Sequence, residues 1–138
     1  MPAIAVENLC FHYDSRKPVL DNLSFTIETG SVTSILGPNG SGKPTLLKLM
    51  LGLKQPVSGS IMIAGRPLDQ IPLSERAKLL AYVPQQHSPI FSYKSLDVAA
   101  MGRVPHAGIF CSLKKADLEI PRQNMPRLGI EHLADRPY

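Results

Sequence analysis

The sequence predicts an α/β fold in which a glycine-rich loop connects a strand to a helix. Segments with strand patterns are followed by segments whose apolar residues recur at helical spacing, and residues 37–42 carry three glycines at such a junction. Of the 138 residues, 43% are hydrophobic and 19% are charged, a composition that supports one packed core and argues against wholesale disorder. We therefore expect a single folded domain with an anion-binding turn.

Strand patterns dominate the first third of the chain. Residues 23–28 alternate strictly between apolar and polar side chains, which predicts a strand with one buried face. Residues 3–9 are a weaker strand candidate, and residues 32–36 form a short β-rich run that leads directly into the glycines. Leu46, Leu47, Met50 and Leu51 then recur at helical spacing, with Gly52 near the expected end of the helix.

Shorter elements follow this helix. Residues 61–63 alternate as a strand does, and residues 75–80 read as a short helix that Ser74 would cap. Residues 80–83 have the apolar character of a buried strand, which Pro84 would end. Together with residues 32–36, they are the expected members of a parallel core sheet.

Charge and cysteine content exclude several functions. The formal net charge is only +4, and no run of basic residues marks a nucleic-acid or membrane-surface patch, so no nucleic-acid partner is expected. Cys10 and Cys111 form no CxxC pair, and we interpret them as ordinary half-buried thiols. The sequence shows no signal-peptide pattern and no apolar stretch of roughly 20 residues, so we expect a cytoplasmic domain without a transmembrane segment.

The glycine-rich segment is the strongest functional signal. Its glycines allow a tight turn and a close approach of the backbone to a phosphate, while backbone N–H groups and the following helix N-terminus attract the anion. Lys43 would supply positive charge to the β- and γ-phosphates. The alternative is a plain turn with a surface lysine, which the flanking strand and helix patterns disfavour. The expected phosphate-binding residues are Gly37, Pro38, Asn39, Gly40, Ser41, Gly42 and Lys43.

Position 44 departs from the phosphate-loop pattern GxxxxGK[ST]. Pro44 stands where Ser or Thr would ligate Mg²⁺, and proline also removes one backbone N–H from the loop. A proline in the first helical turn is compatible with folding, so we expect the loop to form while the metal site fails. Thr45 has a hydroxyl, but on a helix it points about 100° away from position 44.

These residues, followed by Thr45-Leu46-Leu47, resemble the Walker A segment of ABC transporter ATP-binding subunits. The resemblance extends over essentially the whole chain and implies the P-loop NTPase fold of that family, with N-terminal antiparallel strands, a parallel core sheet and a helical subdomain. It implies ATP as the cofactor, with Thr45 among the nucleotide contacts. It also implies that Tyr13 stacks on adenine, and that Gln85, in the Q-loop match 81–86, contacts Mg²⁺ and the attacking water.

The resemblance also carries expectations about partners and domain layout. Residues 101–108 and 128–138 are similar to importers of iron–siderophore complexes, haem or cobalamin. Membrane-spanning permease subunits and a second ATP-binding subunit would be the partners, at the inner face of the cell membrane. Residues 1–86 would form the nucleotide-binding core, and residues 87–138 an incomplete helical subdomain.

Three parts of the family pattern do not occur in this sequence: the Leu-Ser-Gly-Gly-Gln signature, an apolar run ending in Asp-Glu, and the catalytic histidine that follows them. The core sheet is therefore expected to be incomplete. The resemblance places a helix at residues 116–128, which Pro121 and Pro126 should break. These features predict a C-terminally truncated, inactive ATPase that binds nucleotide weakly.

Two other functions remain open. The chain could be a non-catalytic module that docks on a transporter membrane subunit through residues 86–110. It could also be a different phosphate-loop enzyme, such as a small kinase, but Tyr13, residues 58–65 and Gln85 argue against this, and no acceptor site is evident.

Overall fold

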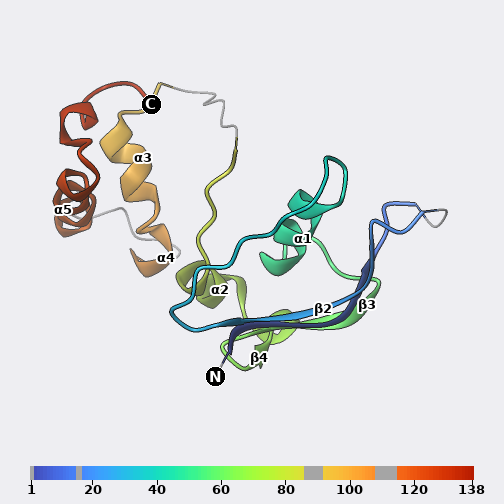
Figure 1. Cartoon of the computed structure of the whole chain (residues 1–138). Helices are drawn as coiled ribbons and strands as arrows, with labels where there is room; N and C mark the ends of the chain where they lie inside the picture. Colours follow the sequence, from blue (N-terminus) through green and yellow to red (C-terminus); the bar gives the residue numbers. More distant parts are fainter. Residues whose placement is uncertain (1, 15–16, 86–91, 108–114) are drawn as a thin grey trace. The chain divides into compact units, whose positions relative to one another are not determined.

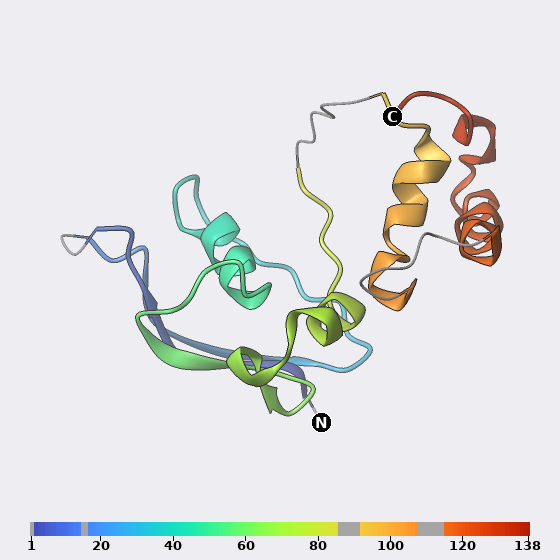
Figure 2. The same cartoon turned by 180° about the vertical axis from the view of Figure 1, so that it is seen from behind.

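The computed structural model describes residues 2–14, 17–85, 92–107 and 115–138 (Figures 1 and 2). By its internal contacts the chain divides into two compact units, Met1–Leu73 and Ser74–Tyr138. They are called unit 1 and unit 2 and are described separately. The expected boundary at residues 86/87 touches a segment that lies outside the described residues.

Unit 1 contains a four-stranded sheet. Its strands are β1 (Pro2–Phe11), β2 (Leu20–Glu28), β3 (Ser58–Ile63) and β4 (Arg66–Pro67). The order is β2-β1-β3-β4, and every neighbouring pair is antiparallel. The strands expected at residues 3–9, 23–28 and 61–63 are all present, and β1 is central between β2 and β3.

A bulge in β1 lets two core residues share one face of the sheet. Val6 is 1% exposed and Leu9 is 0% exposed, although residues three apart on a regular strand point to opposite faces. The register with β2 shifts between them, and Asn8 has a positive φ of 48°. Gly59 of β3 lies against this bulge. Its position requires glycine, because a Cβ there would collide with the carbonyl oxygens of Glu7 and Asn8.

Helix α1 (Lys43–Met50) lies on one face of this sheet (Figures 1 and 2). Its buried side chains include Leu46, Leu49 and Met50, which follow the 3.6-residue period of an amphipathic helix. The helix closes at Leu51, and Gly52 follows with a positive φ of 68°. The helix expected from the leucine spacing is therefore confirmed, together with its stop.

Two expected strands are absent, so those predictions are wrong. Residues 32–36 and 80–83 have no strand structure, and neither segment pairs with a strand anywhere in the described part of the chain. Val32 is 99% exposed, and Leu36 and Val83 are each 90% exposed. A strand of a parallel sheet needs at least one hydrogen-bonded neighbour and cover on both faces. Local β character alone does not produce a strand where these neighbours are lacking.

Unit 2 is helical. Helices α3 (Ser95–Met101) and α5 (Lys115–Asn124) contact each other, and the buried residues here are Leu96 and Ala100 of α3, Pro121 of α5 and Met125, which follows α5. The helices of unit 2 are α2 (Leu73–Leu79), α3 (Ser95–Met101), α4 (Val104–Ala107) and α5 (Lys115–Asn124), and the first residue of α2 belongs to unit 1. Unit 2 also contains the short 3-10 helices η2 (Pro126–Leu128) and η3 (Glu131–Leu133). A third, η1 (Leu68–Gln70), belongs to unit 1.

The end of the chain is tied back to the start of α3. Tyr138 N–H donates to the carbonyl of Tyr93 at 2.9 Å, and Ser95 N–H donates to the carbonyl of Arg136 at 2.9 Å. The Lys94 ammonium lies 3.0 Å from the Asp135 carboxylate, and this hydrogen bond lowers the pKa of Asp135 and raises the pKa of Lys94. Both side chains are exposed, so the backbone bonds carry most of this closure.

Two expectations about unit 2 are corrected. Pro121 lies inside α5 and does not break it, because the helix continues to Asn124 and Met125 N–H donates to the Pro121 carbonyl at 2.9 Å. The proline ring is buried against its neighbours, which offsets the hydrogen bond lost inside the helix. The α-helix does end before Pro126, which opens η2. Ser74 lies within α2 rather than capping it.

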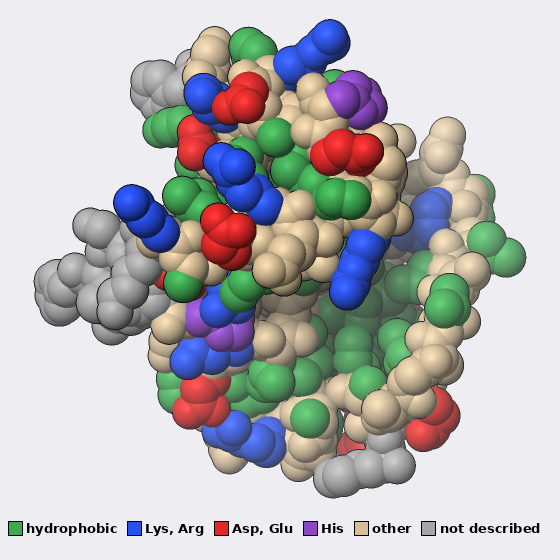
Figure 3. All heavy atoms as spheres, turned by 90° about the vertical axis from the view of Figure 1, so that its left-hand side faces the viewer, with side chains coloured by type: hydrophobic (Ala, Val, Ile, Leu, Met, Phe, Trp, Pro, Cys, Tyr) green, Lys and Arg blue, Asp and Glu red, His purple; other side chains and the backbone are tan. Residues whose placement is uncertain are grey.

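The distribution of charged side chains on the surface is consistent with the low net charge of +4. Over the helices of unit 2, basic and acidic side chains are interspersed on the face that Figure 3 displays. No helix within the described ranges is long and apolar enough to cross a membrane.

The core of unit 1 yields a stability prediction. Leu9→Ala should lower the free energy of unfolding by about 2 to 5 kcal/mol, because Leu9 is 0% exposed and its removal leaves a cavity. Leu36→Ala makes the same change at a side chain that is 90% exposed, and should shift this free energy by no more than about 0.5 kcal/mol. Urea unfolding followed by circular dichroism measures both, and equal losses would contradict the burial seen here.

Candidate functional site

The glycine-rich loop lies between β2 and α1, within unit 1 (Figure 1). Gly40 and Gly42 have φ values of 81° and 86°, in the left-handed region that favours glycine. A Cβ on Gly42 would also meet Val19 Cγ1 at 3.0 Å and the Val19 carbonyl oxygen at 3.1 Å. The entry to α1 is thus held against the segment that leads into β2, and only glycine fits there.

The N-terminus of α1 opens onto this loop. Gly42 is the N-cap, and its carbonyl accepts the first intrahelical bond from Leu46 N–H at 2.9 Å. Gly42 has no side chain to cap the helix, so the first backbone N–H groups stay available to an anion. The turn before it is closed by Ser41 N–H, which donates to the Pro38 carbonyl at 3.2 Å. This arrangement fits a phosphate group.

Lys43 folds its side chain back over the loop. Its ammonium donates to the carbonyls of Gly37 and Pro38 at 2.6 and 2.8 Å, and lies 3.4 Å from Ser41 Oγ. The loop therefore already surrounds a positive charge with its own backbone. A bound phosphate would compete for the same ammonium, which is the role that the sequence predicts for Lys43.

The residues after Lys43 do not fit a magnesium ion. Pro44 occupies the first turn of α1, as expected, and offers neither a hydroxyl nor a backbone N–H. Thr45 is 7% exposed, and its Oγ1 lies 3.1 Å from the hydroxyl of Tyr13, so it is engaged within the protein. The loop thus fits phosphate, while the usual metal-ligand position beside it lacks its oxygen.

Tyr13 lies just beyond the end of β1 and meets three other side chains. Besides the hydroxyl contact with Thr45, its ring packs edgewise on Phe11, with centroids 5.0 Å apart and planes at 88°. The ammonium of Lys54 lies 4.7 Å from the centroid of the Tyr13 ring. Tyr13 is still 61% exposed, so a flat base has room to stack on it.

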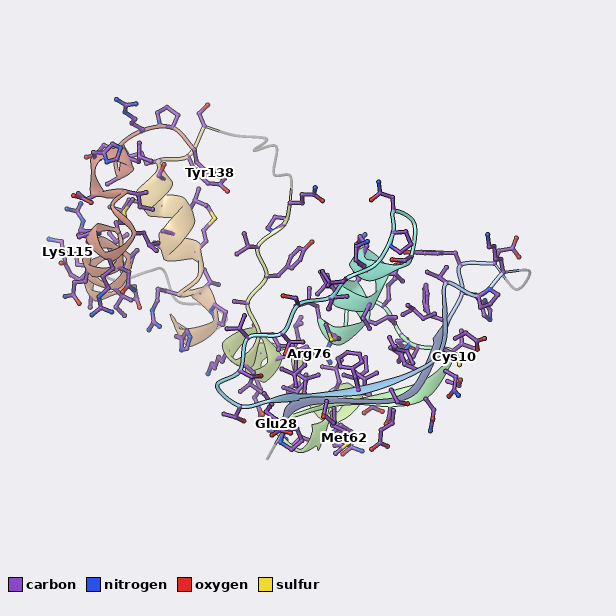
Figure 4. The ribbon with its side chains drawn as sticks, viewed as in Figure 1. Cys10, Glu28, Met62, Arg76, Lys115 and Tyr138 are labelled. Carbon is purple, nitrogen blue, oxygen red and sulfur yellow. The ribbon has the colours of Figure 1, made fainter. Side chains whose placement is uncertain are left out.

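The structure thus brings together Tyr13 and Thr45, which the sequence predicts as nucleotide contacts. Tyr13 follows Cys10 by three residues in the sequence. Figure 4 labels Cys10 at one end of the sheet, with Glu28 and Met62 toward the other end. Lys54 was not predicted as a site residue. Its only local signal is its position shortly after α1, which ends at Met50, and that position does not reveal a contact with Phe11 of β1.

The remaining candidates are described each within its own unit. Gln85 is exposed and belongs to unit 2, whereas the loop and Tyr13 belong to unit 1. Cys10 is half-buried, and Cys111 lies outside the described residues. His106 and His132 are exposed, and no group of three His, Cys, Asp or Glu side chains that could hold a metal occurs among the residues that the structure covers.

Three known proteins illustrate what this chain is similar to. A "Probable iron chelatin transport ATP-binding protein" of Helicobacter pylori is 42% identical over 135 residues, 96% of this chain and 52% of that protein. The "Hemin import ATP-binding protein HmuV" of Photobacterium damselae is 40% identical over 122 residues, 88% of this chain and 44% of that protein. The solved structure of cbiO1 from Clostridium perfringens is 28% identical with a TM-score of 0.71, covering 99% of this chain and 54% of that one.

The chain spans about half the length of these relatives. The expected P-loop fold of the ABC ATPase type is confirmed by the structural similarity, and the family model described as "ABC transporter" matches residues 20–138. Because that match takes in the phosphate loop and most of the chain, this protein belongs to the ABC transporter family.

Proposed function

We propose that this chain is the nucleotide-binding part of an ATP-binding subunit of an ABC importer. The observation that carries the proposal is the loop Gly37–Lys43, in which left-handed glycines, an uncapped helix N-terminus and a loop-bound ammonium converge. Each of these favours the phosphates of a nucleotide, and Tyr13 offers a stacking surface for the base.

The transported substrate in this proposal is an iron–siderophore complex or a similar chelate. Support comes from the printed names of the relatives, which refer to iron chelatin transport and hemin import. The partners would be membrane-spanning permease subunits and a second ATP-binding subunit, with the chain peripheral to the inner face of the membrane. The cbiO1 structure is described as part of an ABC transporter complex, which supports an assembly of this kind.

The 138-residue chain itself should bind nucleotide weakly, largely without Mg²⁺, and should not hydrolyse it. Pro44 removes one hydroxyl and one backbone donor from the site. The sequence also contains no apolar run ending in Asp-Glu, the family pair that would organise Mg²⁺ and polarise the attacking water. Binding can persist under these conditions because the loop and the stacking surface remain.

The role of Lys43 can be tested by binding. Lys43→Met should weaken ATP binding by roughly ten- to a hundredfold, because it removes a charged hydrogen-bond donor from the phosphates. Lys48→Met is the matched control: Lys48 is exposed on the same helix, and its loss should leave the affinity unchanged. Calorimetric titration measures both variants, and an unchanged affinity in Lys43→Met would contradict the proposed site.

Two substitutions separate the two defects at position 44. Pro44→Ala restores a backbone N–H and should raise ATP affinity about tenfold, equally with EDTA or with Mg²⁺. Pro44→Ser restores the hydroxyl as well, and should show a further gain that appears only with Mg²⁺. Titrations of both variants under both conditions give the comparison. If Pro44→Ser equals Pro44→Ala in Mg²⁺, the missing hydroxyl is not the metal defect.

Hydrolysis is expected to be absent. A phosphate-release assay on the wild-type chain should give no turnover above the buffer background. Pro44→Ser should not restore it, because the water-polarising carboxylate is still missing. Turnover by the wild-type chain that disappears in Lys43→Ala would refute this prediction.

A further inference from the structure

Lys54 makes an interaction that the proposed nucleotide contacts do not account for. Its ammonium lies 4.7 Å from the centroid of the Tyr13 ring and 5.8 Å from that of Phe11. Both distances are within the range of a cation–π interaction. Among the described residues no carboxylate pairs with this ammonium, so the two rings are its partners.

The backbone places Lys54 beside the rings. At the end of α1, Leu53 N–H donates to the carbonyl of Lys48 at 2.9 Å and Gly52 N–H donates to that of Leu49 at 2.9 Å, the pair of bonds of a Schellman motif. Three residues after Lys54, Val57 N–H donates to the carbonyl of Cys10 in β1 at 2.9 Å. The segment that carries Lys54 is therefore tied to the helix before it and to the strand that leads to Tyr13.

The two rings differ in exposure. Phe11 is 8% exposed and belongs to the core, whereas Tyr13 is 61% exposed. An exposed tyrosine just beyond a strand would ordinarily sample several rotamers, and ordering it on binding costs conformational entropy. Here Phe11, the Thr45 hydroxyl and the Lys54 ammonium all contact the Tyr13 side chain, so much of that ordering is present before a ligand arrives.

We propose that Lys54 is a positioning residue for the nucleotide base. It holds the ring of Tyr13 in the orientation on which a base stacks, and it therefore contributes to the affinity for the base rather than for the phosphates. This inference rests on the proposed function. It adds Lys54 to the proposed nucleotide site, as a residue whose ammonium acts through the Tyr13 ring.

A simpler electrostatic role makes a different prediction. A lysine near a nucleotide site can attract the polyphosphate through its charge alone. In that case removal of the charge weakens every polyphosphate ligand alike. If Lys54 acts through the ring, its removal weakens ATP and leaves inorganic tripolyphosphate, which has no base, unaffected.

The test compares these two ligands on the full chain. Lys54→Met keeps a long apolar side chain and removes the charge, and it should weaken ATP binding about two- to fivefold, with tripolyphosphate affinity unchanged. Lys54→Arg should restore ATP affinity, because a guanidinium also stacks on aromatic rings. Lys48→Met is again the matched control, with the same change on an exposed part of α1.

A second background tests the dependence on Tyr13. In Tyr13→Leu, which has no ring to position, Lys54→Met should have no further effect on ATP affinity. An equal additional loss in that background would overturn the inference, as would an equal weakening of ATP and tripolyphosphate by Lys54→Met. If the wild-type chain binds ATP and Lys54→Met binds it with the same affinity, this inference alone is refuted. If the wild-type chain binds neither ATP nor tripolyphosphate, the proposed function is refuted as well.

Discussion

The pairing of β1 on both sides is the constraint on which the rest of unit 1 depends. β1 is hydrogen-bonded to β2 along one edge and to β3 along the other. Beyond these ladders, its last residues accept two more bonds, from Val19 N–H to Phe11 at 2.8 Å and from Val57 N–H to Cys10 at 2.9 Å. The end of β1 thus fixes the segment before β2 and the segment after α1. The phosphate loop, which packs on Val19 through Gly42, takes its position from the same strand end.

Much of this arrangement was predictable because it is local. Alternation over residues 23–28 and the leucine spacing after Lys43 each describe one element, and the structure contains both. The phosphate loop is equally local, since its glycines and the helix that follows them are contiguous. The predictions that failed depend on distant neighbours. Residues 32–36 and 80–83 have strand-like side chains, but a strand also needs partners, which no local pattern supplies.

The same reasoning explains the other surprises. The burial of both Val6 and Leu9 requires a bulge, and the bulge requires Gly59 from another strand, so the three-residue spacing in β1 could not be interpreted alone. Pro121 appeared to be a helix breaker because the rule counts the lost hydrogen bond and ignores burial of the ring. Lys54 was overlooked because its partners, Phe11 and Tyr13, are far away in sequence.

Lys43 and Lys54 show how surroundings give one side-chain type two different roles. The Lys43 ammonium is surrounded by carbonyl oxygens of the loop, which hold a strongly hydrated cation where phosphate oxygens could replace them. The Lys54 ammonium faces two rings, whose electron-rich faces hold a cation without satisfying its three donors as oxygens would. A phosphate loop that has lost the Mg²⁺ hydroxyl at Pro44 depends more heavily on the remaining contacts. In the proposed site, the base end, where neighbouring side chains contact Tyr13, would therefore carry a larger share of the nucleotide affinity than it would beside an intact metal site.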